Sequence, residues 1–325
     1  MTEQFKKIYC EDNGITVGIF DEPIFSDRIR LFGHEVKFYN FRALIDRIGE
    51  EAYFKVYKEA KNRAIEFIQS TSTFEALKNL SAKDYEVRDD VRNVPRSDIY
   101  NKHNVGSTFI SIDMIKGNFN TYVTFSRMLD EPVRFNDGSY DYEEFISQFT
   151  DVNYIINSRE FRQNVFGQCA PSSIAKIERY LTRTFLAKLI DKGYFNIEDV
   201  MTVHDDEIVI KVNDDIRAKL EILKAEVRAS EIPFSYQMYD IWKVNGSKGY
   251  IKHITDGKNA STDELKCAYK IEQPAIYRFL ANEQGDCSDL MYIEPNTGKK
   301  AMLVEKLSFS IEKSAVDKDK TTRNK

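Results

Sequence analysis

Two short runs of apolar, mostly β-branched residues flank an acidic segment in the middle of the chain. Within residues 200–212 these runs alternate as two paired strands do, and residues 204–207 separate them. The pattern predicts a β-hairpin with Asp205 and Asp206 at its turn. Aspartate is common at such turns because its side chain bonds backbone amides and tolerates turn dihedrals, so a purely local role is the first alternative.

A second apolar strand also ends in a carboxylate. Residues 109–113 run from Phe109 to Asp113, after a small-residue start and before a polar segment. Carboxylates that lie side by side repel one another when ionised, and a cation relieves that repulsion. Two acid-ended strands in one chain therefore indicate a site for a divalent metal.

Helical spacing appears on both sides of these strands. Residues 41–68 carry apolar positions at helical intervals with a break near Gly49, and residues 73–80 predict a further helix. Pro171 starts another helix, which Gly193 stops. Its apolar stripe is formed by Ile174, Ile177, Leu181, Phe185 and Leu189.

Other segments predict further strands and one more helix. The predicted strands are a hairpin at 15–25, a strand at 35–40, a pair within 232–251 with Lys248 in the turn, and strands at 290–294 and 301–311. Residues 261–280 predict the helix. Together these patterns predict an α+β fold.

Composition permits a large core and favours an intracellular protein. The chain has 325 residues, 42% of them apolar and 30% charged, with a net charge of −5, which predicts two or three subdomains. Its four cysteines have neither zinc-site nor disulfide spacing and indicate reduced thiols. The first residues lack a hydrophobic signal, and no segment has the apolar length of a membrane span. We therefore expect a cytoplasmic protein without membrane contact.

Positive charge concentrates around the predicted helix at 171–190. Residues 159–192 contain seven basic and three acidic side chains, and Lys176, Arg179 and Arg183 share one helical face. A solvated helix face is the ordinary explanation of such a pattern. Beside metal-binding carboxylates, however, this face is suited to bind a triphosphate or a nucleic-acid backbone.

The order of these motifs resembles the palm domain of template-dependent nucleic-acid polymerases. That family has an acid-ended strand, then a loop and helix, then an acidic hairpin, here residues 109–113, 167–190 and 203–207. The 92 residues from Asp113 to Asp205 are similar to the compact reverse-transcriptase and RNA-dependent RNA polymerase palms. The His-Asp-Asp sequence is more like the third motif of the DNA polymerase I and single-subunit RNA polymerase superfamily.

The resemblance implies a division of the chain as well as a fold. It implies an antiparallel palm sheet backed by helices at residues 106–258, preceded by a small, mainly helical, fingers-like region at 1–105. Residues 259–312 would form an α/β thumb-like or accessory subdomain, and residues 313–325 a disordered tail. Because the flanking regions are small, a partner protein that supplies processivity is expected.

The resemblance further implies nucleotidyl transfer with two Mg²⁺ or Mn²⁺ ions, a template with its primer, and nucleoside triphosphates. The metal ligands and catalytic residues would be Asp113, Asp205 and Asp206. Residues expected to bind the substrate are Arg88, Arg96, Gln168, Lys176, Arg179 and Arg183, with Lys248 as a proton donor to pyrophosphate. Asn118 and Phe119 would lie beside the sugar and influence ribose choice.

Two other functions remain open from the sequence. A catalytically silent palm-like protein could bind nucleic acid or support assembly, and its function would tolerate Asp→Asn changes at the acids. A metal-dependent phosphohydrolase could use His204 and Asp205, although that family carries the pair on a helix rather than among β-branched residues.

Overall fold

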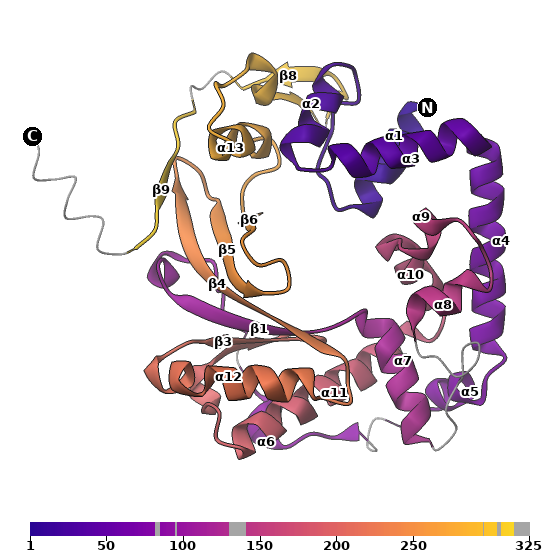
Figure 1. The fold of residues 1–325 in the computed structure, drawn as a ribbon, viewed down its shortest axis with the longest axis vertical. Coiled ribbons are helices and arrows are strands. Elements are labelled where there is room, and N and C mark those ends of the chain that lie inside the picture. Colours follow the sequence, from indigo (N-terminus) through magenta and orange to yellow (C-terminus); the bar gives the residue numbers. More distant parts are fainter. Residues whose placement is uncertain (82–84, 95, 130–140, 295, 304–306, 315–325) are drawn as a thin grey trace, which may run out of the picture.

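The computed structural model describes residues 1–81, 85–94, 96–129, 141–294, 296–303 and 307–314. It confirms an α+β protein in which a seven-stranded antiparallel sheet is packed with helices (Figure 1). Residues 315–325, most of the expected disordered tail, lie outside the described part.

The sheet is built around the two predicted acid-ended segments. Its strands are β1 (Thr108–Met114), β2 (Val200–Val203), β3 (Glu207–Lys211), β4 (Phe234–Asn245), β5 (Tyr250–Gly257), β6 (Asp263–Lys266) and β9 (Ser310–Glu312). They lie in the order β2-β3-β1-β4-β5-β6, and β9 pairs with β4. The first acid-ended strand therefore lies directly beside the acidic hairpin.

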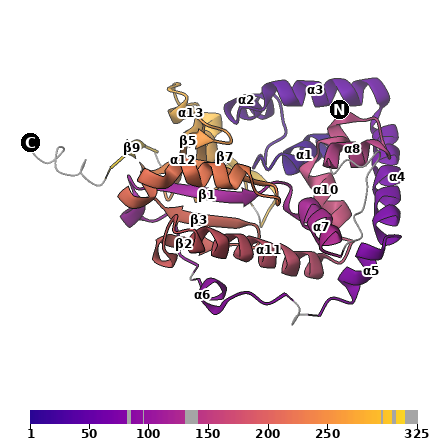
Figure 2. The same ribbon diagram turned by 60° about the horizontal axis from the view of Figure 1, so that its bottom comes forward.

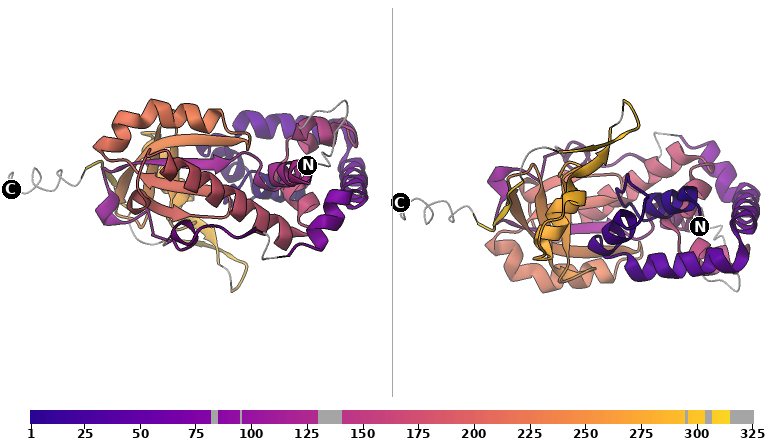
Figure 3. Two further views of the ribbon diagram at one scale, coloured as in Figure 1. Left: turned by 90° about the horizontal axis from the view of Figure 1, so that it is seen from below. Right: turned by 90° about the horizontal axis from the view of Figure 1, so that it is seen from above.

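Alternation along β1 divides the sheet into two differently covered faces. Ile110 and Ile112 belong to the main core, which they share with the helices α11 (Pro171–Asp191) and α12 (Asp214–Arg228). Seen from below, the two helices lie side by side on that face (Figure 3). On the other face, Phe109 packs in a smaller cluster with Tyr239 and Ile254.

Helices before and after β1 complete the molecule. They are α1 (Glu3–Asp12), α2 (Ile24–Leu31), α3 (Glu35–Ile48), α4 (Glu50–Gln69), α5 (Ser72–Lys78), α6 (Asp89–Arg92), α7 (Gly117–Met128), α8 (Tyr142–Ser147), α9 (Asn153–Ile156) and α10 (Arg159–Phe166). The long helix α4 runs down one side of the molecule, from α3 to α5 (Figure 1). The predicted break near Gly49 is confirmed, since α3 ends at Ile48 and α4 starts at Glu50.

Two predictions in the N-terminal region are wrong. Residues 15–20 alternate as expected, and Ile15, Val17 and Ile19 are buried, but the segment pairs with no strand of the described ranges, and α2 follows it. Residues 35–40 are the start of α3, where Phe38 packs in the core while Val36 is 73% exposed. In the first segment the alternation reflects burial of an extended chain, and in the second it falls at the start of a helix.

The predictions for the C-terminal region are also partly wrong. The predicted helix at 261–280 is instead β6 followed by α13 (Gln273–Leu280), which has Pro274 in its first turn. The strands at 290–294 and 301–311 are β7 (Met291–Ile293), β8 (Lys300–Met302), which pairs with it, and the separate β9. Short 3₁₀ turns are η2 (Lys102–Asn104), η3 (Ile197–Asp199) and η4 (Cys287–Leu290).

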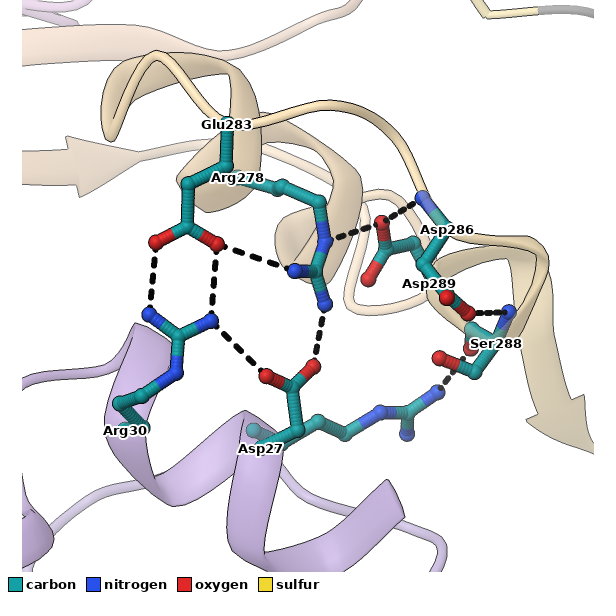
Figure 4. Close-up of polar contacts among 8 residues, drawn as sticks. Asp27, Arg30, Arg278, Glu283, Asp286, Ser288 and Asp289 are labelled. Carbon is teal, nitrogen blue, oxygen red and sulfur yellow. Dashed lines mark hydrogen bonds and ion pairs between the residues drawn. The ribbon is translucent and has the colours of Figure 1, made fainter. Parts of the chain in front are cut away.

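Ion pairs join the N-terminal helices to the C-terminal region (Figure 4). Arg278 of α13 is buried and pairs with Asp289 at 2.6 Å, with Glu283 at 3.0 Å and with Asp27 of α2. Arg30, also on α2, pairs with Glu283 at 2.6 Å. We call these five residues the clasp.

The four cysteines, Cys10, Cys169, Cys267 and Cys287, are free thiols. Among the described residues, no helix combines the length and the apolar character needed to cross a bilayer.

Candidate active site

The acids at the ends of β1 and of the hairpin meet as the strand pairing requires. Asp113 lies opposite Glu207 in the register of β1 with β3, and opposite Ser235 in that of β1 with β4. The amide of Met114 donates to the Asp206 carbonyl at 2.9 Å. These bonds hold the hairpin turn against the end of β1, where the chain turns into α7 (Figure 2).

Helix α11 brings two adjacent side chains to this turn. Arg179 pairs with Asp205, with its Nη2 and Nε at 2.9 and 3.0 Å from the same carboxylate oxygen. Glu178 lies on the other side, against Gly117 at the start of α7. A Cβ at position 117 would come within 2.2 Å of the Glu178 carboxylate and 3.4 Å of Asp206 Oδ2. Glycine at 117 therefore permits Glu178 and Asp206 to approach the same point.

Crowding of negative charge perturbs the carboxyls. Burial, then Asp206 and Glu207, raises the pKa of Asp113 to about 6. Burial, then the Asp206, Asp205 and Asp113 charges, raises the pKa of Glu178 to about 7. The pKa of Asp206 is raised too, chiefly by burial. The cluster thus lacks enough nearby positive charge.

Two lysines of the β4–β5 region oppose the rise in the pKa of Asp113. The charges of Lys258 and Lys252 lower its pKa, against the larger effect of burial. Lys252 is buried, donates to the Gln237 amide oxygen at 2.6 Å and lies 4.5 Å from the centre of the Tyr239 ring. Burial lowers the pKa of Lys252 itself.

A basic pocket of about 600 Å³ adjoins Asp205 through Arg179. Its charged lining is Glu86, Arg92, Arg96, Lys176, Arg179 and Arg183, and its uncharged lining includes Tyr85 and Tyr180. Arg183 is only 8% exposed, and its Nε and Nη1 have no hydrogen-bond partner among the described residues. Burial, then Arg179, lowers the pKa of Arg183. We call this cavity the arginine pocket.

Four of the expected substrate-binding residues, Arg96, Lys176, Arg179 and Arg183, therefore line one cavity, whereas two others lie elsewhere. Lys248 follows the far end of β4, about ten strand residues from Ser235 and so on the order of 30 Å from Asp113. There it contacts the Tyr269 ring. Arg88 pairs with Asp90 and with Asp191, at the C-terminal end of α11.

Asn118 and Phe119, the residues expected to lie beside the sugar, differ in their surroundings. Asn118 is half-buried in the first turn of α7, near the acids. Phe119 is 1% exposed and packs against Tyr142, Phe145 and Phe166, so as placed it cannot touch a sugar. Gln168 is exposed, and its carbonyl accepts from Gln69 at 3.4 Å.

The donors suit a hard divalent cation in type. Asp113, Asp205, Asp206 and Glu178 offer the carboxylate oxygens that Mg²⁺ and Mn²⁺ prefer, and their raised pKa values at three positions indicate a need for a cation. Within the described ranges, however, no three or more His, Cys, Asp or Glu side chains are grouped closely enough to hold an ion. Binding therefore requires side-chain movement, including release of Asp205 by Arg179.

Sequence reasoning missed Glu178, Lys252, Lys258 and Arg92. Glu178 had a detectable signal, because it falls four residues after Ile174 and three before Leu181, on the apolar stripe of the helix. A carboxylate in such a stripe is costly to bury without a reason. The two lysines had no local signal, because their place near Asp113 depends on the register of three strands.

Comparison with known proteins adds no assignment. No protein-family model, no curated protein and no solved structure matches this chain.

Proposed function

We propose that this protein is a palm-type, template-directed nucleic-acid polymerase that uses two divalent metal ions. One observation supports this most: Asp113, Asp206 and Glu178 converge from β1, the hairpin turn and α11, while the arginine pocket opens beside Asp205. Carboxylates for metals beside cations for phosphates are what nucleotidyl transfer needs.

The order of elements agrees with this proposal. An acid-ended strand, a helix with a basic face and an acidic hairpin follow one another in the chain, and the antiparallel sheet brings the first and third together.

Each group would have a distinct task. Asp113, Asp205 and Asp206 would hold the ions, whose charge makes the attacking hydroxyl more nucleophilic and neutralises the leaving pyrophosphate. The arginine pocket would bind and orient the triphosphate by charge-assisted hydrogen bonds. Glu178 would position Asp206, and Asn118 would face the sugar.

The residue that gives a proton to pyrophosphate would differ from Lys248, the one expected from the sequence. Lys248 is too distant, while Lys258 and Lys252 act electrostatically on Asp113. Lys258 is exposed and can move toward a substrate, so it is the better candidate for giving a proton to pyrophosphate.

The test is extension of a labelled primer on RNA and DNA templates. Ribonucleotides and deoxyribonucleotides would be offered separately, with Mg²⁺ or Mn²⁺. Extension coded by the template is expected for the native protein, and Asp113→Asn should reduce its rate at least about 100-fold. Asp215→Asn, the same change on an exposed part of α12, is the matched control and should keep full activity.

A binding protein without catalysis is the second candidate. The Arg179–Asp205 ion pair and the lack of a ready metal group among the described residues favour it. In that case the folded protein would bind labelled oligonucleotides or triphosphates, would extend no primer under any condition, and would be indifferent to Asp113→Asn.

A further inference from the structure

Arg179 belongs both to an ion pair and to the lining of the arginine pocket. Its guanidinium bonds Asp205 through two nitrogens, and the same side chain lines the arginine pocket. Both partners of the ion pair are partly exposed, at 46% and 37% of their side chains. Pairs of this kind are weak and exchange readily for a better partner.

The arginine pocket favours the binding of an anion that can replace Asp205 as the partner of Arg179. Arg183, one helical turn after Arg179 on α11, is buried, and two of its nitrogens find no hydrogen-bond partner in the described part of the chain. Leaving charged donors unpaired in a buried place is costly, and an oxyanion would satisfy them. A phosphate-type anion can also bind Arg179 and Lys176 together, while Asp205 satisfies Arg179 alone.

We propose that Arg179 is a latch: a phosphate-type anion bound in the arginine pocket draws Arg179 away from Asp205 and so frees this carboxylate for a divalent cation. The inference rests on the proposed function and deepens it, because it makes triphosphate binding precede full assembly of the metal site. A cation arriving alone meets a carboxylate that is already neutralised.

Lys176 provides the matched control. It lies on the same helix and lines the same pocket, so its loss removes the same charge, but among the described contacts Asp205 bonds Arg179 and not Lys176. Arg179→Gln and Lys176→Gln therefore both remove one positive charge from the pocket, and only Arg179→Gln also removes the bond to Asp205. Arg179→Lys, which keeps the charge and loses the planar fork, is a second variant of the latch itself.

The experiment measures Mn²⁺ binding from the electron paramagnetic resonance signal of the free ion. Titrations use the full chain at constant ionic strength, with chloride in one series and sulfate, as the pocket anion, in the other. In chloride, Arg179→Gln should bind Mn²⁺ about two- to fivefold more tightly than the native protein, the range a partly exposed pair allows. Arg179→Lys should fall between them, and Lys176→Gln, which removes a pocket charge but no bond to Asp205, should tighten Mn²⁺ binding less than Arg179→Gln does.

Sulfate gives the second readout. It should tighten Mn²⁺ binding by the native protein and leave Arg179→Gln unchanged. Equal responses of Arg179→Gln and Lys176→Gln in both series, with binding lost in Asp205→Asn, would overturn the latch while keeping the metal site. No Mn²⁺ binding by any form, Arg179→Gln included, would overturn the metal-dependent function and the latch with it.

Discussion

At the scale of single residues, the carboxylates of the candidate site work against the stability of the protein. Burial of Asp113, and then the nearby charges of Asp206 and Glu207, raise its pKa. Asp113→Asn removes one of these charges. We expect the variant to be more stable by at least about 1 kcal/mol at pH 8 in EDTA, measured by urea unfolding. A loss of stability would mean that the carboxylate makes favourable contacts in the folded protein.

Replacing Arg183 should leave the stability of the free protein unchanged or higher, but should weaken anion binding. Its guanidinium is buried, and the residues that the structure describes give Nε and Nη1 no partner, so Arg183→Met should keep the free protein as stable as before or stabilise it by about 1 kcal/mol. The same change should weaken anion binding in the arginine pocket. Thermal shift with and without tripolyphosphate measures both effects. A variant that is less stable but still stabilised by tripolyphosphate would contradict the role of Arg183.

At the scale of elements, Glu226 fastens α12 to α11. Its carboxylate contacts Lys188 at 2.9 Å and Lys192 at 2.6 Å, and these bonds lower its pKa from 4.5 to about 2. A carboxyl whose pKa falls on folding adds stability above its unfolded value, and this stability disappears as the pH drops toward the folded value. The melting temperature of Glu226→Gln should therefore lie below that of the native protein at pH 6.

The difference should then shrink between pH 4.5 and pH 2, where the native carboxyl becomes protonated. Circular dichroism melts across this range measure it. Glu231→Gln, an exposed residue just after the same helix, is the control and should follow the native curve. A gap that stays constant with pH would show that Glu226 contributes through packing rather than charge.

The elements that sequence predicted well are those with independent local signals. Helix α11 has a proline start, a glycine stop and a continuous apolar stripe, and the hairpin has two alternating strands around acids. The segments at 15–25 and 35–40 had only a few alternating positions. Four or five residues cannot distinguish a strand from a helix or from an extended segment packed on the core.

The residues of the candidate site also differ in how well the sequence predicted their positions. Asp113, Asp205 and Asp206 could be found because each acid follows an apolar strand. Lys248 was misplaced because its glycine-flanked turn gave no information on which end of β4 it occupies. Lys258 reaches the acids through pairing at the opposite end of that hairpin. Such positions follow from strand register, which only the folded sheet defines.

At the scale of the whole molecule, the clasp connects an N-terminal helix to the C-terminal region through ion pairs. Asp289 is 2% exposed and pairs with Arg278, so Arg278→Met strands a buried carboxylate. The expected loss is roughly 3–5 kcal/mol in the free energy of unfolding. Guanidinium unfolding, followed by the fluorescence of Trp242, measures it.

A second substitution separates the stranded charge from lost packing. Asp289→Asn keeps an acceptor for the Asp286 amide and removes the charge. In the Arg278→Met background it should recover at least about 1 kcal/mol, whereas alone it should destabilise. Additive losses in the double variant would mean that the two residues do not act as a pair.

The clasp also affects the order in which parts of the protein fold during synthesis. Asp27 and Arg30 bond residues 251 and 253 positions further along the chain. On a ribosome, α2 would thus be complete long before its charged partners exist, and the core around Phe25 and Ile29 would have to form without them. The final step of folding would then await the emergence of α13 and η4, so pauses in translation near residue 290 would prolong an intermediate open at its N-terminal end.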